Sequence, residues 1–284
     1  MDNKEFIKEA TGFVQSTYDR FESYQKIVNE ILIEFNRVCN KKGVKYWLAY
    51  GTLLGAIRDK GQVPWDYDVD VWSFFDDCGK LIDALESELS NEFYYTYVTN
   101  TDHYPGGYRL LRVCKKGYSM MAIHVDVFFM VGACDNERKM KKYSKRLLRY
   151  QFIFDTKCLP YHYKAYIKDK ANRYLNKVYE ILYSFIPLSI LKRLELSHLN
   201  KYPVNKKVFV LDNAVIPTDA FGTEYVIING NKFPIPSGYD IILQTLYGDY
   251  NQYPSIESRL WEFYRHTKEI DTIQALYNHN RYDK

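Results

Sequence analysis

The chain has 284 residues, 46% of them apolar and 26% charged, and this balance is that of a globular protein, which excludes disordered and fibrous classes. The net charge of +4 is too small to indicate nucleic-acid binding. The five cysteines stand far apart and form no C-x-x-C pair, which disfavours a disulfide framework and a zinc ribbon.

Neither a signal peptide nor a membrane span is expected. The first ten residues are polar and charged, and the longest apolar run is interrupted by Pro187 and falls short of the roughly 20 apolar residues that a span needs. We expect a cytoplasmic protein that can lie at the inner face of a membrane. The basic run Lys139–Arg149 reads as a helix whose charged face is either solvated or docked on an anionic surface.

The first expected elements are a helix, a strand and a second, short helix. Apolar residues recur at helical spacing from Tyr24 to Val38, and a lysine pair and Gly43 follow as a stop. The β-branched and aromatic residues 44–50 predict a strand that ends at Gly51. Thr52 is then expected to be the N-cap of the short helix.

Two later segments alternate polar and apolar residues and are expected to be strands. In residues 68–72 the alternation places Asp68 and Asp70 on one face. In residues 122–130 it places His124, Asp126 and Phe128 on one face. A helix and two aromatic strands, near 93–98 and 108–114, are expected between these two segments.

The remaining sequence completes an α+β fold. Residues 138–205 are rich in lysine and tyrosine and mostly helical in pattern, and the tail returns to short strands and a final amphipathic helix. We therefore expect a mixed sheet core flanked by helices, with a helical insertion or lobe. The expected parts are a catalytic core at 1–137, a lobe at 138–205, and a segment at 206–284 that completes the core.

Asp68, Asp70 and Asp126 are candidates for one site, because neighbouring strands would bring their carboxylates together. Converging carboxylates raise one another's pKa unless a cation neutralises them. Oxygen ligands favour Mg²⁺ or Mn²⁺, which commonly bridge to substrate phosphates. The pattern therefore favours metal-dependent phosphoryl or nucleotidyl transfer.

Three other interpretations of the aspartates remain. They can be ordinary loop residues, or the carboxylate pair of a glycosidase, whose spacing in three dimensions a sequence does not supply. A calcium loop begins in the same way, but Val71 stands where that motif requires glycine. A glycine turn at Gly51 and Thr52, which suits a phosphate, and Arg58, whose planar donors suit the same ligand, shift the balance toward phosphate chemistry.

On these residues the sequence resembles the LicD family of phosphotransferases, whose core is similar to the polymerase-β-like nucleotidyltransferase fold. The family signature, approximately G-T-L-L-G-x-x-R-x-x-G-x-x-P-W-D-D-D-x-D, is matched almost throughout by residues 51–70. The "HVDVFF" segment around Asp126 resembles the family's I-D-I-F segment, and residues 233–254 resemble its C-terminal Y-G-D segment.

The resemblance implies transfer of a phospho-substituted group, such as phosphocholine, from a CDP- or CMP-linked donor to a hydroxyl of a surface glycan or its lipid-linked precursor. CDP-choline and CDP-ribitol are such donors. It implies that Asp68 and Asp70 are metal ligands and that Asp126 is a third ligand or a general base. It also implies a phosphate-side turn at Gly51 and Thr52. The remaining implied or candidate contacts with phosphate or nucleotide are Arg58, Arg109, Arg112 and His124.

Two departures from the family pattern stand close to these residues. Tyr67 replaces the usual second aspartate, and Phe129 and Met130 replace the usual proline and aspartate after Asp126. Asp66 has no assigned role, and Trp65 is expected to support the aspartate strand. In the C-terminal segment, Asp249 is expected at most to fix a turn.

Two further functions remain open on the sequence alone. One is a nucleotidyltransferase that attacks a nucleoside triphosphate and releases pyrophosphate. The other is a non-catalytic glycan- or nucleotide-binding module that uses some of the 28 tyrosines.

Overall fold

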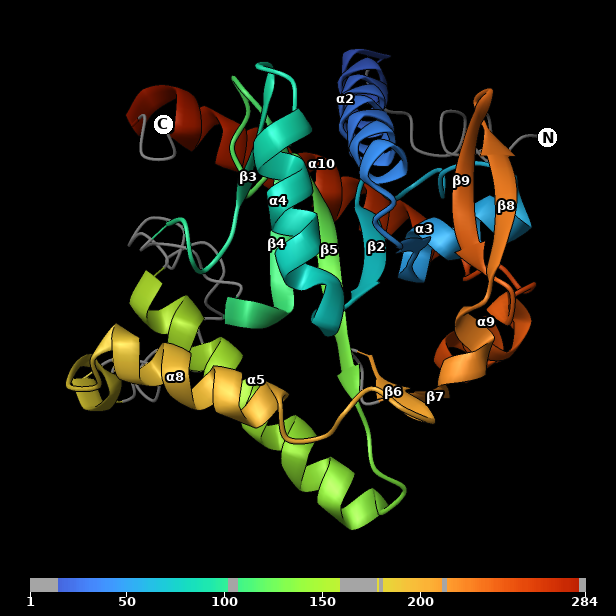
Figure 1. The fold of residues 1–284 in the computed structure, drawn as a ribbon. Helices are drawn as coiled ribbons and strands as arrows, with labels where there is room; N and C mark the ends of the chain where they lie inside the picture. Colours follow the sequence, from blue (N-terminus) through green and yellow to red (C-terminus); the bar gives the residue numbers. More distant parts are fainter. Residues whose placement is uncertain (1–14, 102–106, 159–177, 179–180, 211–213, 281–284) are drawn as a thin grey trace. The chain divides into compact units, whose positions relative to one another are not determined.

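The computed structural model describes residues 15–101, 107–158, 178, 181–210 and 214–280. The chain divides into two compact units (Figure 1). Unit 1 contains residues 1–95, 112–128 and 219–284, and unit 2 contains residues 96–111 and 129–218. The division expected at residues 137 and 205 stays a prediction, and residues 159–177 and 179–180 of the expected lobe lie outside the described residues.

Unit 1 begins with the predicted amphipathic helix, α2 (Gln15–Lys42), which is longer than expected at its start. Its apolar stripe is buried because those residues recur on one face at helical spacing. The buried residues of the stripe include Val28, Ile31, Leu32, Phe35 and Val38. The helix ends where the lysine pair precedes Gly43, as the sequence predicts.

The strand expected at residues 44–50 is wrong in its extent, since β1 contains only Trp47–Leu48. Tyr50 has a φ of 42°, and this left-handed turn ends the extended backbone. The following helix α3 is Tyr50–Leu54 and continues as a π-helical turn, η1, at Gly55–Asp59. Ala49, not Thr52, is the N-cap of α3.

Five strands are neighbours in one sheet in the order β1-β2-β5-β4-β3. These strands are β2 (Val69–Phe74), β3 (Phe93–Thr96), β4 (Leu110–Lys115) and β5 (His124–Gly132). β1 runs antiparallel to β2, with Trp47 opposite Trp72. The expected α+β fold with a mixed sheet and flanking helices is confirmed, and β2 and β5 are neighbours.

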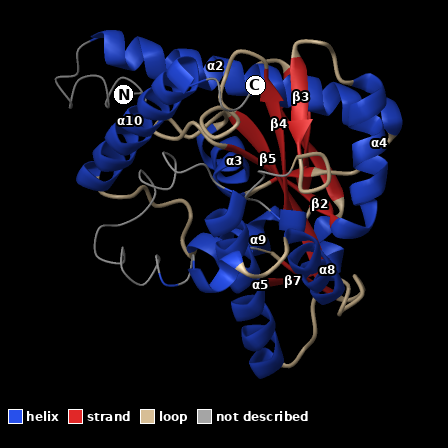
Figure 2. Cartoon of the chain, turned by 90° about the vertical axis from the view of Figure 1, so that its left-hand side faces the viewer, coloured by secondary structure: helices blue, strands red, loops and turns tan. Residues whose placement is uncertain are grey.

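Helices cover both faces of this sheet. Figures 1 and 2 show α4 (Cys78–Glu88) on one face and α10 (Ile256–Asn280) on the other. Helix α2 is tied to α10 by the Tyr24 hydroxyl, which donates a hydrogen bond of 2.9 Å to Asp271 Oδ1. α10 is therefore held in place against the core, although it begins about 180 residues after β2 ends.

A hairpin and an aromatic cluster complete unit 1. The hairpin strands are β8 (Thr223–Ile228) and β9 (Asn231–Pro236), and α9 (Tyr239–Tyr247) follows. η6 (Thr218–Phe221) leads into β8 and carries Phe221. The rings of Trp47, Trp72 and Phe74 surround Phe221 with centroid separations of 5.5, 5.9 and 6.0 Å. Trp72 and Phe74 alternate onto the same face of β2 as Asp70, so this cluster packs on the continuation of the aspartate face.

Unit 2 is built on the end of β5 and on two helices, α5 (Glu137–Cys158) and α8 (Leu188–Leu199). Strand β6 (Lys207–Phe209) pairs with β5 and with β7 (Val215–Pro217). The predicted apolar stripe of α5, at Met140, Tyr143 and Leu147, is buried. Nowhere in the described ranges is a helix long and apolar enough to cross a membrane.

Candidate functional site

The predicted carboxylates lie together in unit 1. Asp70 is the second residue of β2, Asp68 precedes that strand, and Asp126 is the third residue of the neighbouring β5. The charges of these carboxylates act on one another, since Asp68 and Asp126 each raise the pKa of Asp70. The expectation that two strands bring the aspartates to one place is therefore met by the sheet order.

Two of these carboxylates resist ionisation. Burial, and then the charge of Asp66, raise the pKa of Asp68 to about 6. Burial and the neighbouring aspartates raise the pKa of Asp70 well above its ordinary value. Negative charge on Asp68 and Asp70 thus lacks sufficient compensation from the protein, and a divalent cation would supply it.

Asp126 differs because it has cationic neighbours of its own. Its Oδ1 accepts a hydrogen bond of 2.8 Å from Arg112 Nε and lies 3.4 Å from His124 Nε2. Burial favours the neutral acid, but the Arg112 guanidinium and His124 outweigh it and hold the pKa of Asp126 well below its usual range. Arg112 and His124, both predicted as phosphate contacts, are therefore placed beside the third carboxylate.

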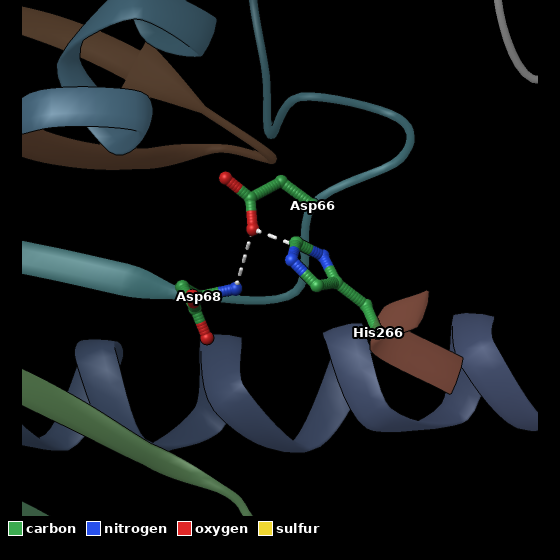
Figure 3. Close-up of side chains that lie close together, drawn as sticks. All are labelled: Asp66, Asp68 and His266. Atoms are coloured by element: carbon green, nitrogen blue, oxygen red, sulfur yellow. Dashed lines mark hydrogen bonds and ion pairs between the residues drawn. The ribbon is translucent and has the colours of Figure 1, made fainter. Parts of the chain in front are cut away.

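Asp66 and His266 bring a further pair of groups to Asp68 (Figure 3). The Asp68 backbone N–H donates a hydrogen bond of 3.1 Å to Asp66 Oδ1, and His266 Nδ1 lies 3.7 Å from the same oxygen. One ligand atom from each of the three side chains lies within 4.8 Å of the other two. His266 comes from α10, and no motif or spacing in the sequence pointed to it.

The glycine turn contacts the aspartates, and its expected contact with phosphate stays a prediction. A Cβ added at Gly51 would stand 2.9 Å from Asp66 Oδ2, so the absence of a side chain leaves room for this carboxylate. Thr52 is buried, and its Oγ1 accepts a hydrogen bond of 2.8 Å from the Asp70 backbone N–H. The turn therefore holds the aspartates in place, whether or not it also contacts phosphate.

The contacts described for Arg58 and Arg109 are with residues outside the carboxylate cluster. The Arg58 side chain is 6% exposed, forms an ion pair of 2.8 Å with Asp59, and lies 4.4 Å from the Tyr253 ring. Arg109 is buried in unit 2, where its guanidinium lies 5.6 Å from the Phe209 ring. The phosphate contacts expected of these two arginines stay predictions.

The remaining predicted residues have mainly packing roles. Trp65 is buried with its ring 5.7 Å from the Arg58 guanidinium, in agreement with a supporting role. Tyr67, the departure from the family pattern, is buried with its ring 5.1 Å from that of His266. Asp249 accepts a hydrogen bond of 2.6 Å from Gln252 Nε2, as expected of a residue that fixes a turn.

A divalent cation fits the donor set at Asp66, Asp68 and His266. The three side chains offer two carboxylates and one imidazole, and His266 Nδ1 is buried without a hydrogen-bond partner. One bound cation would neutralise the carboxylates whose pKa is raised and would give the unpaired ring nitrogen a partner. The ligand set Asp68, Asp70 and Asp126 that the resemblance implies stays a prediction.

A separate cavity of about 650 Å³ is lined only by residues of unit 2, so it contains none of these carboxylates. Its lining includes Met140, Lys141, Lys145, Leu148, Lys207 and Phe209. Lys207 is paired with Asp135 at 2.7 Å, and Lys141 and Lys145 belong to the predicted basic run of α5.

Comparisons with known proteins agree with the motifs. Residues 43–166 match the family described as "LicD/FKTN/FKRP, nucleotidyltransferase domain". The chain is 27% identical over 259 residues to the lipopolysaccharide cholinephosphotransferase LicD of Haemophilus influenzae, an alignment that covers 83% of this chain and 92% of that protein.

Two shorter similarities were also found. A segment of 42 residues is 50% identical to the human ribitol 5-phosphate transferase FKRP and covers 15% of this chain and 8% of that protein. A segment of 48 residues is 35% identical to the uncharacterized protein RP689 of Rickettsia prowazekii and covers 17% of this chain and 18% of that protein.

Proposed function

We propose that this phosphotransferase, whose residues 43–166 match the LicD family domain, moves a phospho-substituted group from a CDP- or CMP-linked donor to a glycan hydroxyl. Phosphocholine is the group named for the relative that aligns over most of the chain, and lipopolysaccharide is its acceptor. The observation that carries this proposal is the group of partly buried carboxylates at β2 and β5 inside the matched domain.

In the proposed reaction, a sugar hydroxyl attacks the donor phosphorus that bears the transferred group. The bond between this phosphorus and the bridging oxygen breaks, and CMP leaves. A bound Mg²⁺ or Mn²⁺ would screen the negative charge of the donor phosphates. Asp68 would hold the cation, and Thr52 fixes the strand beside it through the Asp70 backbone.

We assign Asp126 to a charge-orienting role. Arg112 and His124 hold its pKa well below the usual range, and a general base works best when its pKa is near the operating pH. An ionised Asp126 between Arg112 and the other aspartates would keep its charge throughout the reaction. This favours a cation ligand or an orienting group over the general base that the resemblance also allows.

Three finer points belong to the same proposal. The mixed sheet with helices on both faces supports a polymerase-β-like nucleotidyltransferase core, and the description of the matched family supports it as well. The lysine-rich face of α5 supports peripheral contact with an anionic membrane, where a lipid-linked glycan precursor would be found. We also propose the division into a core, a lobe and a completing C-terminal segment.

The test incubates the purified protein with Mn²⁺ or Mg²⁺, lipopolysaccharide and one donor at a time. The donors are CDP-choline, CDP-ribitol, CDP-glycerol, CDP-ethanolamine and CMP-aminoethylphosphonate. A thermal-shift screen of the same donors comes before the activity assay, because a bound donor stabilises the native state. We expect release of CMP with one donor. Asp68→Asn and Asp70→Asn should each lower this rate by about 10²- to 10³-fold.

Asp76→Asn is the matched control, because Asp76 is an exposed aspartate two residues after the end of β2. Normal CMP release by Asp68→Asn and Asp70→Asn would contradict the site. Pyrophosphate release from a nucleoside triphosphate would replace the proposal with a nucleotidyltransferase. Absence of turnover over the whole panel would favour a binding module.

A further inference from the structure

We infer that His266, from the C-terminal helix α10, is a metal ligand that completes a mixed oxygen and nitrogen site with Asp66 and Asp68. Such a site selects a first-row transition ion, such as Mn²⁺ or Zn²⁺, over Mg²⁺. This inference refines the cation of the proposed function and rests on that function only for the cation's role in catalysis. The cation site itself rests on the contacts of the three side chains.

The first support is geometric. His266 Nδ1 lies 3.7 Å from Asp66 Oδ1, and the ligand atoms of all three side chains lie within 4.8 Å of one another. Ligand atoms that share one ion at bond lengths of about 2.0–2.2 Å are themselves about 3–4 Å apart. Small rotations of the side chains would therefore bring all three onto one ion.

The second support is the unpaired ring nitrogen. His266 is 7% exposed, and its Nδ1 has no hydrogen-bond partner although it points toward Asp66. A buried polar atom without a partner costs about 1–3 kcal/mol. An ion bound between the imidazole and the carboxylates would remove this cost and the repulsion between the two acids.

An imidazolium paired with Asp66 explains the contacts less well. Arg265 Nη2 lies 2.6 Å from His266 Nε2, and a guanidinium can only donate, so this nitrogen must accept and the ring must be neutral. The burial of His266 also opposes a charged ring. A neutral imidazole is the form that binds metal ions.

The other side of the ring offers the partner that a metal-bound histidine needs. Binding through Nδ1 moves the ring proton to Nε2, and Glu262 Oε2 lies 3.4 Å from Nε2 and can accept it. Arg265 would then turn away from Nε2 and keep Glu262 and Glu269, which it already contacts at 2.6 and 3.5 Å. Glu262 is therefore a positioning residue for His266.

The donor types decide which ion is favoured. Mg²⁺ prefers an all-oxygen octahedral shell, whereas imidazole suits Zn²⁺ and other first-row ions. Gly51 helps to form the site, because the absence of a side chain there leaves room for Asp66 Oδ2. Turn, strand and C-terminal helix thus converge on one cation.

The test measures the ion directly, without nucleotide or acceptor. The full chain is stripped with EDTA and loaded with Mn²⁺, and pulsed EPR reads the nuclear modulation from any nitrogen bound to the ion. We expect nitrogen coupling in the wild type that changes to the ¹⁵N pattern on ¹⁵N-histidine labelling. The coupling should be lost in His266→Ala and kept in His279→Ala, which removes an exposed histidine of the same helix.

Calorimetry with the metal alone gives the affinities. We expect His266→Ala to weaken Mn²⁺ and Zn²⁺ binding at least about tenfold and to change Mg²⁺ binding less than threefold. Glu262→Gln should weaken Mn²⁺ binding by a smaller factor.

Two results would overturn the inference. One is the absence of nitrogen coupling in the wild type, and the other is coupling that persists in His266→Ala and so comes from another histidine such as His124. If His266→Ala fails to fold, His124→Ala decides: nitrogen coupling kept in this variant supports His266, and coupling lost in it would overturn the inference. CMP release is scored separately, so nitrogen coupling without transfer would reject the proposed function and keep this site.

Discussion

Unit 1 and unit 2 both bury carboxylates, and they differ in what compensates the charge. In unit 1, Asp126 Oδ1 accepts a hydrogen bond of 2.8 Å from Arg112 Nε, and the pKa of Asp126 falls well below the usual range. In unit 2, Glu195 is 1% exposed, and among the described residues it accepts a hydrogen bond of 3.1 Å from the Tyr108 backbone N–H, with a weaker contribution from Arg109. Its burial prevails and raises the pKa of Glu195 to about 7.

The charge of Asp126 is neutralised by a cationic side chain of the protein, whereas the charge of Glu195 is not. A guanidinium in direct contact outweighs burial, whereas a single neutral N–H donor does not. Asp68 and Asp70 resemble Glu195 in their raised pKa, yet Asp68 lies in a group with Asp66 and His266 that an external cation can neutralise. Charge that is left uncompensated in a group of ligands indicates function, whereas an isolated buried acid indicates only a cost.

The largest expected effect comes from removing the guanidinium that compensates Asp126. Arg112→Gln should lower the free energy of unfolding by about 3–5 kcal/mol at pH 7, because it leaves a buried carboxylate without its cation. Urea unfolding followed by circular dichroism measures this change. The double variant Arg112→Gln with Asp126→Asn should recover most of the loss, and a double variant as unstable as the single one would contradict the charge explanation.

A smaller effect is expected at Glu195, and it depends on pH. Its folded pKa of about 7 lies above its ordinary value of 4.5, so the folded state binds more protons and loses stability as the pH rises from about 4.5 to 7. Glu195→Gln lacks this loss. The free energy of unfolding of Glu195→Gln minus that of the wild type should therefore be larger at pH 8 than at pH 5 by on the order of 2–3 kcal/mol.

Urea unfolding of both proteins at the two pH values measures this difference. Glu137→Gln is the control, because Glu137 is an exposed glutamate of the same unit. Stability profiles that run parallel in the wild type and in Glu195→Gln would show that Glu195 is compensated after all.

The smallest effect is expected at Asp70. Without divalent cations at pH 8, Asp70→Asn should raise the free energy of unfolding by about 1 kcal/mol, because it removes one of several repelling carboxylates. This corresponds to a rise of about 2–4 °C in Tm. Excess Mn²⁺ should stabilise the wild type more than the variant, and thermal unfolding in EDTA and in MnCl₂ compares them. A variant less stable than the wild type in EDTA would show that the carboxylates are already compensated by the protein.

Much of the fold follows from local patterns. The apolar period of α2, the alternation of β2 and β5, and the stripe of α5 predict these elements, because one buried face needs a repeat that matches the backbone geometry. The strand at residues 44–50 was predicted too long. Its pattern did not show the left-handed turn at Tyr50, since a positive φ at an aromatic residue is imposed by packing.

The candidate site divides in the same way. The sequence placed Asp68, Asp70 and Asp126 on two strands and indicated chemistry with phosphate, because spacing within a strand is local. It missed the interactions among these residues. The contacts of Thr52 with the Asp70 backbone and of Arg112 with Asp126 depend on which strands are neighbours, and the place of Arg109 in the other unit depends on how the chain divides.

The sequence by itself determined the type of domain and the acids that it carries. Only the tertiary structure decided which groups face those acids. His266 stands 200 positions after Asp66, and it reaches that carboxylate because α10 packs across the sheet and not because of any repeat in the sequence. A contact between distant segments is set by the packing of whole elements, and it is this packing that adds an imidazole to a group of aspartates.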